Sequence, residues 1–170
     1  MFRKWLAMWL CLCLFPLGCF GEESCGCFEY EVLSDGTAAI TRYTDEESRF
    51  LVVPSSLNDV KVSRIGDYAF AYSPLEKIVI PEGVLEIGAC AFNACYHLTD
   101  IRLPGTLRRI EADAFLCCTA LEQISFPGGL QYIGDEAFYN CQKLKTANVP
   151  DTTQMGVRVF EACYLLGVEP

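Results

Sequence analysis

The sequence predicts a mainly-β repeat solenoid, a short right-handed superhelix with a β-hairpin cap at its N-terminal end. Three observations support this class: a period of 22 to 23 residues, a strand-and-turn pattern inside each period, and a non-periodic segment before it. Phenylalanine marks the period most clearly, at successive spacings of 22, 23, 23 and 22 residues: Phe70, Phe92, Phe115, Phe138 and Phe160. A fixed period of this length is typical of units that stack and bury one continuous core.

Three other residue types keep the same register. We therefore predict about four and a half 23-residue units over residues 60–170. The leucine column follows each phenylalanine, the isoleucine column precedes it, and the prolines are spaced by 23: Leu75, Leu98, Leu121, Leu144 and Leu166; Ile65, Ile87, Ile110 and Ile133, with Met155 in the fifth place; Pro81, Pro104, Pro127 and Pro150.

Each unit contains one strand that ends at its proline. Ile78 and Ile80 alternate with Lys77 and Val79, the period-two pattern of a half-buried strand. Pro81 ends the strand because proline has no N–H to donate to the ladder. The outward positions predict a small polar sheet of mixed charge: Lys77 and Val79, Asp100 and Arg102, Gln123 and Ser125, Thr146 and Asn148.

The segment before the repeats, residues 22–59, is predicted to be an N-terminal β cap. Phe28–Val32 alternates, Ser34–Gly36 is a turn signal, and Thr37–Tyr43 is rich in β-formers, which together predict a hairpin. Arg49–Val53 is predicted as a further extended piece of this cap, ending at Pro54. Repeat proteins need such a terminal cap with a polar outer face.

Residues 1–21 are predicted to be a signal peptide rather than part of the fold. Arg3 and Lys4 precede an apolar run that ends among small residues. A membrane anchor is the first alternative, although the run is short and contains Pro16. Lipidation at Cys19 is the second, since Leu17–Cys19 is similar to the end of a bacterial lipobox, with Pro16 where leucine is usual. Each reading predicts an exported protein in the periplasm, at the cell surface or secreted.

The repeat unit, I-G-x-x-A-F-x-x-C-x-x-L-x-x-I-x-[IL]-P, resembles the BspA-like leucine-rich repeat, a type described in treponemes and oral bacteria. The resemblance covers roughly Val60–Leu166. It implies a bacterial, non-catalytic solenoid that is typically exported. Several members of the family are linked to adhesion or host-protein binding.

Eleven cysteines fall into distinct groups. Four recur three residues after a phenylalanine, with Ser73 in the same place in the first unit: Cys95, Cys118, Cys141 and Cys163. This spacing is the repeat period and not that of a zinc motif, so we interpret them as a column of buried thiols. Four others are candidate disulfide partners or reactive thiols, with Cys90 expected to face solvent: Cys25, Cys27, Cys90 and Cys117.

The composition and motifs exclude several functions. The net charge of -9 argues against nucleic acid as a partner. His97 is the only histidine, and phosphate-binding glycine loops and HExxH motifs are absent from the sequence. We therefore predict no enzyme activity, no cofactor and no metal, with any membrane contact made through the lipid anchor.

A protein partner is the remaining expectation. Tyrosines supply contact area at low entropic cost, so the turn tyrosines and the strand-face cations are the candidate binding residues: Tyr72, Tyr96, Tyr139, Tyr164, Lys77 and Arg102. The alternative is a structural component of the envelope that self-associates. Its last unit is poorly covered and would leave an open C-terminal edge.

Overall fold

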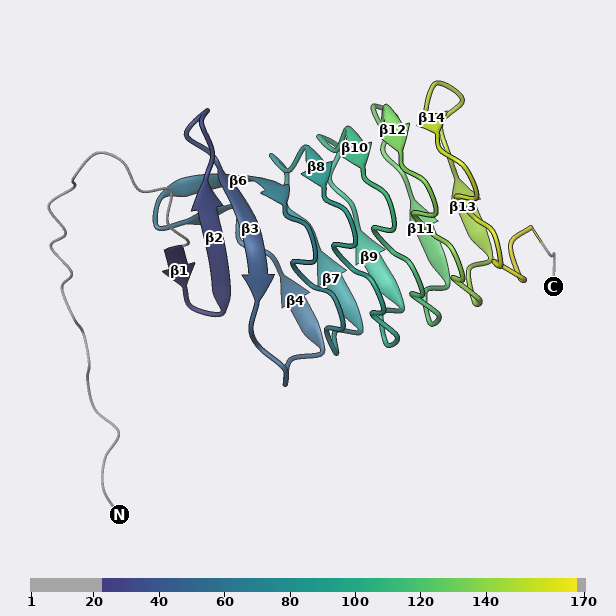
Figure 1. Ribbon diagram of the computed structural model, residues 1–170, viewed down its shortest axis with the longest axis horizontal. Coiled ribbons are helices and arrows are strands. Elements are labelled where there is room, and N and C mark those ends of the chain that lie inside the picture. Colours follow the sequence, from purple (N-terminus) through teal and green to yellow (C-terminus); the bar gives the residue numbers. More distant parts are fainter. Residues whose placement is uncertain (1–22, 168–170) are drawn as a thin grey trace, which may run out of the picture.

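The computed structural model describes residues 23–167 and shows a stack of β coils, about one per sequence repeat (Figure 1). No helix occurs within these residues, and the predicted mainly-β solenoid is confirmed. The predicted signal peptide and Cys19 lie outside the described residues. The fourteen strands are β1 (Glu23–Cys25), β2 (Phe28–Val32), β3 (Ala38–Tyr43), β4 (Phe50–Val52), β5 (Ser56–Leu57), β6 (Val60–Ile65), β7 (Lys77–Val79), β8 (Glu86–Ile87), β9 (Asp100–Arg102), β10 (Arg109–Ile110), β11 (Gln123–Ser125), β12 (Tyr132–Ile133), β13 (Thr146–Asn148) and β14 (Gln154–Met155).

Two sides of the coil stack carry the strands (Figure 1). One is a nine-stranded sheet in the order β1-β2-β3-β6-β8-β10-β12-β14, with β5 paired to β6; we call it the spine sheet. The other, called the strand face, consists of β4-β7-β9 and the separately paired β11-β13. Neighbouring coils pair in parallel and in register, so equivalent residues of successive repeats lie side by side.

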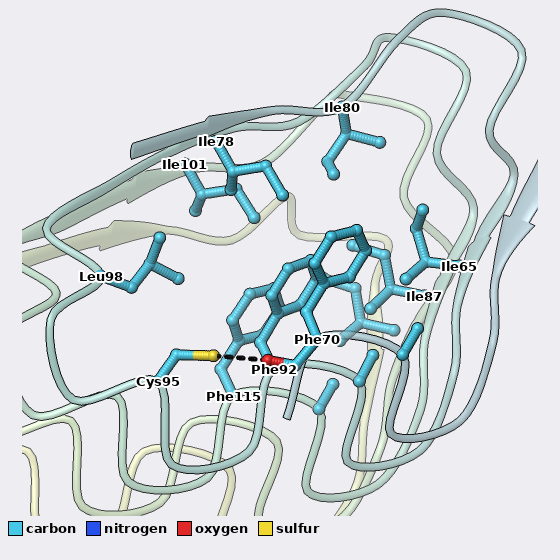
Figure 2. Close-up of a cluster of buried hydrophobic side chains, with 14 of the residues drawn as sticks. Ile65, Phe70, Ile78, Ile80, Ile87, Phe92, Cys95, Leu98, Ile101 and Phe115 are labelled. Carbon is cyan, nitrogen blue, oxygen red and sulfur yellow. Dashed lines mark hydrogen bonds between the residues drawn. The ribbon is translucent and has the colours of Figure 1, made fainter. Parts of the chain in front are cut away.

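The core between the two sides is a set of residue columns, as the repeat predicts. The phenylalanine rings stack with centroids 4.9–5.4 Å apart from Phe70 to Phe160. Figure 2 shows three of these rings between Ile78 and Ile101 of the strand face and Ile65 and Ile87 of the spine sheet. Each column residue in the middle coils is almost fully buried, so its burial contributes about 1.5–3 kcal/mol.

The predicted cap hairpin forms and joins the spine sheet. β2 and β3 pair antiparallel, and β3 then pairs in parallel with β6. The ring of Tyr43, at the end of β3, packs in a tilted arrangement against Phe70 with centroids 5.2 Å apart, and Phe28 packs against Tyr43 in the same way at 5.5 Å. The cap therefore extends both the sheet and the aromatic column by its own residues.

The segment Arg49–Val53 differs from its prediction as part of the cap. β4 pairs in parallel with β7, with Phe50 opposite Lys77 and Val52 opposite Val79. It is the first strand of the strand face. The expected cap–solenoid boundary at residues 59 and 60 falls inside the β5–β6 hairpin, whose two turn residues, Asn58 and Asp59, both have positive φ.

Two columns of non-glycine residues adopt left-handed backbone conformations in the turns beside the phenylalanines. They stand two residues before and two residues after the ring: Tyr68, Cys90, Asp113, Glu136 and Arg158; Tyr72, Ala94, Cys117, Asn140 and Ala162. This conformation costs roughly 1–2 kcal/mol per residue. Backbone hydrogen bonds to the next coil offset it, such as Tyr68 N–H to Ala89 C=O at 3.0 Å.

Candidate interaction surface

The strand face presents two rows of outward side chains. One row aligns Phe50, Lys77 and Asp100, and the other aligns Val52, Val79 and Arg102. The alternate residues point inward, and Ile78 and Ile101 are buried. The predicted outward positions are therefore correct. The side chains of Lys77 and Arg102 are both exposed on this face.

Phe50 and Val52 add an apolar element that the sequence reasoning missed. Their exposed fractions are 60% and 56%, and half-buried Val79 lies beside Val52. The signal that was missed is the equivalence of Pro54 and Pro81: Pro54 follows β4 as Pro81 follows β7. The two prolines are 27 residues apart because the β5–β6 hairpin lengthens the first coil.

The cations around this apolar group are not ion-paired. Within residues 23–167, Arg49, Lys77 and Arg102 belong to none of the ion pairs. On the spine sheet, Arg64 pairs with Glu86 at 3.1 Å and Arg109 with Glu111 at 2.9 Å. In a chain of net charge -9, the N-terminal half of the strand face thus carries three cations that form no described ion pair, and Asp100 is the carboxylate opposite Lys77 in the same row.

The strand face is interrupted between β9 and β11, which share no ladder pairing. The hydrogen bond from Glu122 N–H to Thr99 C=O is 3.4 Å, whereas the equivalent bond from Thr99 N–H to Glu76 C=O is 2.8 Å. A shallow groove of about 400 Å³ lies at this step, lined by Asp100, Ile101, Arg102, Leu103, Gln123 and Ser125. Arg102 therefore lies between the apolar group of Phe50, Val52 and Val79 and this groove.

The predicted tyrosines are not brought together. Tyr72, Tyr96 and Tyr164 are exposed, but Tyr139 is only partly so. They occupy three different positions of the repeat, and Tyr96 and Tyr164 share one position three coils apart. Tyr68, which was not predicted, is 61% exposed and shares a groove of about 410 Å³ with Tyr72 at the junction with the cap.

The cysteine column is buried and hydrogen-bonded. Each thiol donates to the carbonyl of the phenylalanine one coil earlier, as in Cys95 Sγ to Phe70 O at 3.1 Å (Figure 2). Cys118 and Cys141 make the same contact at 3.2 and 3.3 Å. Burial raises the pKa of the Cys118 thiol well above 9.0. The Cys118 thiol therefore remains a protonated donor that links its coil to the preceding one.

The expectation that Cys90 faces solvent is wrong. Its exposed fraction is 8%, although its repeat equivalents Glu136 and Arg158 are more exposed. The exposed Tyr68 of the preceding coil makes a hydrogen bond to the Cys90 thiol, which raises the pKa of the tyrosine. The Cys90 thiol is therefore shielded from solvent in the fold.

The other three thiol candidates lie in two separate places. Cys25 and Cys27 flank Gly26 at the β1–β2 turn, and Cys117 accepts a hydrogen bond from Asn140 Nδ2 at 3.4 Å. All eight cysteines of the described part of the chain are free thiols there. Across that same part, no group of three or more histidine, cysteine, aspartate or glutamate side chains is arranged to hold a metal ion.

The geometry defines a repeat-solenoid protein of the leucine-rich type, and comparison with known proteins gives its family. The family model "BspA type Leucine rich repeat region" matches six copies over residues 53–167, so the chain belongs to this family, as its repeat motif predicted. No curated protein matches the chain. Residues 23–167 contain no helix that is long and apolar enough to span a membrane.

Three solved structures illustrate the relationship. A leucine-rich repeat protein of T. pallidum is 32% identical, with a TM-score of 0.81, covering 86% of this chain and 69% of its own. One from Bacteroides capillosus is also 32% identical, with a TM-score of 0.64 over 79% of this chain and 97% of its own. A leucine-rich cell surface protein of Faecalibacterium prausnitzii shares the fold at 23% identity and a TM-score of 0.63, over 86% and 53% of the two chains.

Proposed function

We propose that this protein is an exported, non-catalytic module that binds a partner protein through its strand face. The exposed group formed by Phe50, Val52 and Val79 beside three unpaired cations is the observation that supports it. Protein interfaces combine an apolar centre with a charged rim, and arginine is enriched in them. Membership of a leucine-rich repeat family is consistent with a role in protein interaction.

Adhesion or host-protein binding is the form of this function that the family resemblance implies. The proposed location, outside the cytoplasm, follows from the predicted signal peptide. The fold neighbour from F. prausnitzii is described as a cell surface protein, which is consistent with that location. Antibody labelling of intact cells tests it, and labelling only after permeabilisation would exclude an adhesin.

A binding screen against immobilised extracellular matrix proteins tests the function itself. Lys77→Glu should reduce capture of any true partner about tenfold, because it reverses a charge at the rim of the surface. Lys143→Glu is the matched control, since Lys143 is also exposed and in no described ion pair but lies in the turn before β13, three coils beyond Lys77. Equal loss in both variants would indicate non-specific charge attraction instead.

Self-association through the last coil is the second candidate. Apolar side chains are exposed on the last described coil: Met155 at 52%, Val157 at 61% and Leu165 at 40%. β14 pairs only with β12, and β13 only with β11. Light scattering at micromolar protein should then give a mass above the monomer that Val157→Lys reduces. A monomeric wild type would exclude this candidate.

A further inference from the structure

β4 is an edge strand whose outer side the cap leaves unpaired. The cap hairpin joins the stack through β3 and β6, on the spine sheet, while β4 pairs only with β7 within residues 23–167. Figure 1 shows β4 as the first strand of the strand face, and the strand pairing assigns β3 to the spine sheet. The solenoid is therefore capped on one side of its first coil and open on the other.

The backbone of β4 points its free groups away from the solenoid. Arg49 C=O accepts from Lys77 N–H at 3.0 Å, and Val53 N–H donates to Val79 C=O at 3.0 Å. Backbone groups alternate in direction along a strand, so residues 49, 51 and 53 face β7 and residues 50 and 52 face outward. Phe50 and Val52 therefore offer N–H and C=O groups to an added strand.

The inward side of β4 is also incompletely covered. Leu51 occupies the position of Ile78 and Ile101, which are 1% and 4% exposed, yet Leu51 is only partly buried. The preceding loop is held by its own contacts and does not pair with β4. There, Asp45 accepts hydrogen bonds from the backbone N–H groups of Glu47 and Ser48.

The chemistry of the surface beside β4 indicates which kind of partner segment would bind there. Phe50, Val52 and Val79 form an apolar strip, and Arg49, Lys77 and Arg102 surround it without carboxylate partners in the described chain. We propose that the outer edge of β4 binds an extended, acidic segment of a partner protein by strand addition. Main-chain hydrogen bonds would supply affinity, while the apolar strip and the cations select alternating apolar and acidic side chains. This proposal deepens the proposed function, because it assumes that the strand face binds protein.

A peptide of alternating glutamate and valine, blocked at both ends, is the probe, and a lysine–valine peptide is its matched control. Fluorescence anisotropy with the purified chain should show binding of the acidic peptide only, weaker at high salt because the ion pairs are screened. Amide exchange followed by mass spectrometry should show new protection at β4. Binding without this protection, or equal binding of both peptides, would overturn strand addition.

Val52→Pro tests the edge directly. It removes an outward N–H while leaving the Val53 N–H to Val79 C=O bond in place, a substitution that edge strands tolerate. It should weaken peptide binding about tenfold, the effect expected for one or two lost hydrogen bonds. Val52→Thr keeps the N–H and should bind within about threefold of wild type. Equal affinities for the two variants, both of which must show the wild-type melting temperature, would contradict the proposal.

Two further outcomes distinguish strand addition at β4 from the broader proposal that the strand face binds protein. A matrix protein whose capture is lost in Lys77→Glu but unchanged in Val52→Pro would support binding at the strand face and overturn strand addition. If the chain dimerises through β4, light scattering will show a mass that Val52→Pro reduces to the monomer. That result would assign the edge to a second copy and also overturn the proposal.

Discussion

The spine sheet and the strand face are built from the same coils but differ in what their outward side chains do. On the spine sheet, Arg64 pairs with Glu86, and Arg109 lies 4.5 Å above the Tyr132 ring while it pairs with Glu111. On the strand face, Lys77 and Arg102 have no such partners, and β9 and β11 are not hydrogen-bonded in a ladder. Both sides pair neighbouring coils through their strands, but the outward side chains of the spine sheet also interact with each other, whereas Lys77 and Arg102 on the strand face are left available for contact.

The largest effect should come from the interior, where a substitution would weaken both sides together. Phe115 is fully buried and stacks between Phe92 and Phe138 at 5.1 and 4.9 Å. Phe115→Ala should destabilise the protein by about 4 kcal/mol, as buried aromatic truncations do. Phe160→Ala, at the partly exposed end of the column, should cost clearly less in the same urea titration. Equal losses of stability in the two variants would show that burial within the phenylalanine column does not determine its contribution.

A second substitution separates the two sides. A Cβ on Gly134 would lie 2.4 Å from Ala112 N and 2.6 Å from Glu111 C, in the preceding coil beside the spine sheet. Gly134→Ala should cost about 2–3 kcal/mol, because backbone must move. Gly128 follows the strand face and has open space around it, so Gly128→Ala should be neutral or stabilise by up to about 1 kcal/mol. Thermal unfolding of both variants measures the contrast, and a tolerated Gly134→Ala would refute close coil contact there.

Alkaline pH should lower the stability of the folded state relative to the unfolded chain. Burial raises the pKa of Cys118, and a hydrogen bond with Cys163 followed by burial raises that of Cys141, so the folded state keeps both thiols protonated. An unfolded thiol titrates near 9.0, hence stability is unaffected below that pH and falls above it. The slope should approach about 1.4 kcal/mol per pH unit for each thiol. Urea midpoints under reducing conditions measure it, and the double variant Cys118→Ala, Cys141→Ala should show a shallower alkaline loss.

The smallest effect compares one arginine from each side. Arg109→Ala removes the pair with Glu111 and the contact with Tyr132, and should cost about 0.5–1 kcal/mol because the groups are partly exposed. Arg102→Ala should stay within about 0.5 kcal/mol of wild type, since Arg102 supports no described ion pair. Chemical denaturation at low salt resolves the two values. A larger loss for Arg102 would mean that the strand face is structural after all.

The repeat columns were predictable because stacking places equivalent residues of successive coils next to each other. Such residues recur in the sequence at a constant spacing. The prediction failed where the period breaks. The β5–β6 insertion displaced Pro54 from its register, so Phe50 and Val52 were assigned to the cap. The left-handed turn positions give no sequence signal, since tyrosine, cysteine, aspartate, glutamate and arginine all occupy one of them. The burial of Cys90 could not be predicted from its place in the repeat, because its equivalents Glu136 and Arg158 are more exposed.

The interruption between β9 and β11 has a mechanical consequence. In a solenoid the coils are linked in series along the axis, so a stretching force acts on every coil-to-coil step in turn. The step from β9 to β11 has lost its strand ladder on one side, while the spine sheet and the hydrogen bonds of the phenylalanine turns, such as Phe92 N–H to Ala114 C=O at 2.7 Å, continue across it. We expect a single molecule pulled from its two ends to rupture first at this step, dividing the stack into an N-terminal and a C-terminal part.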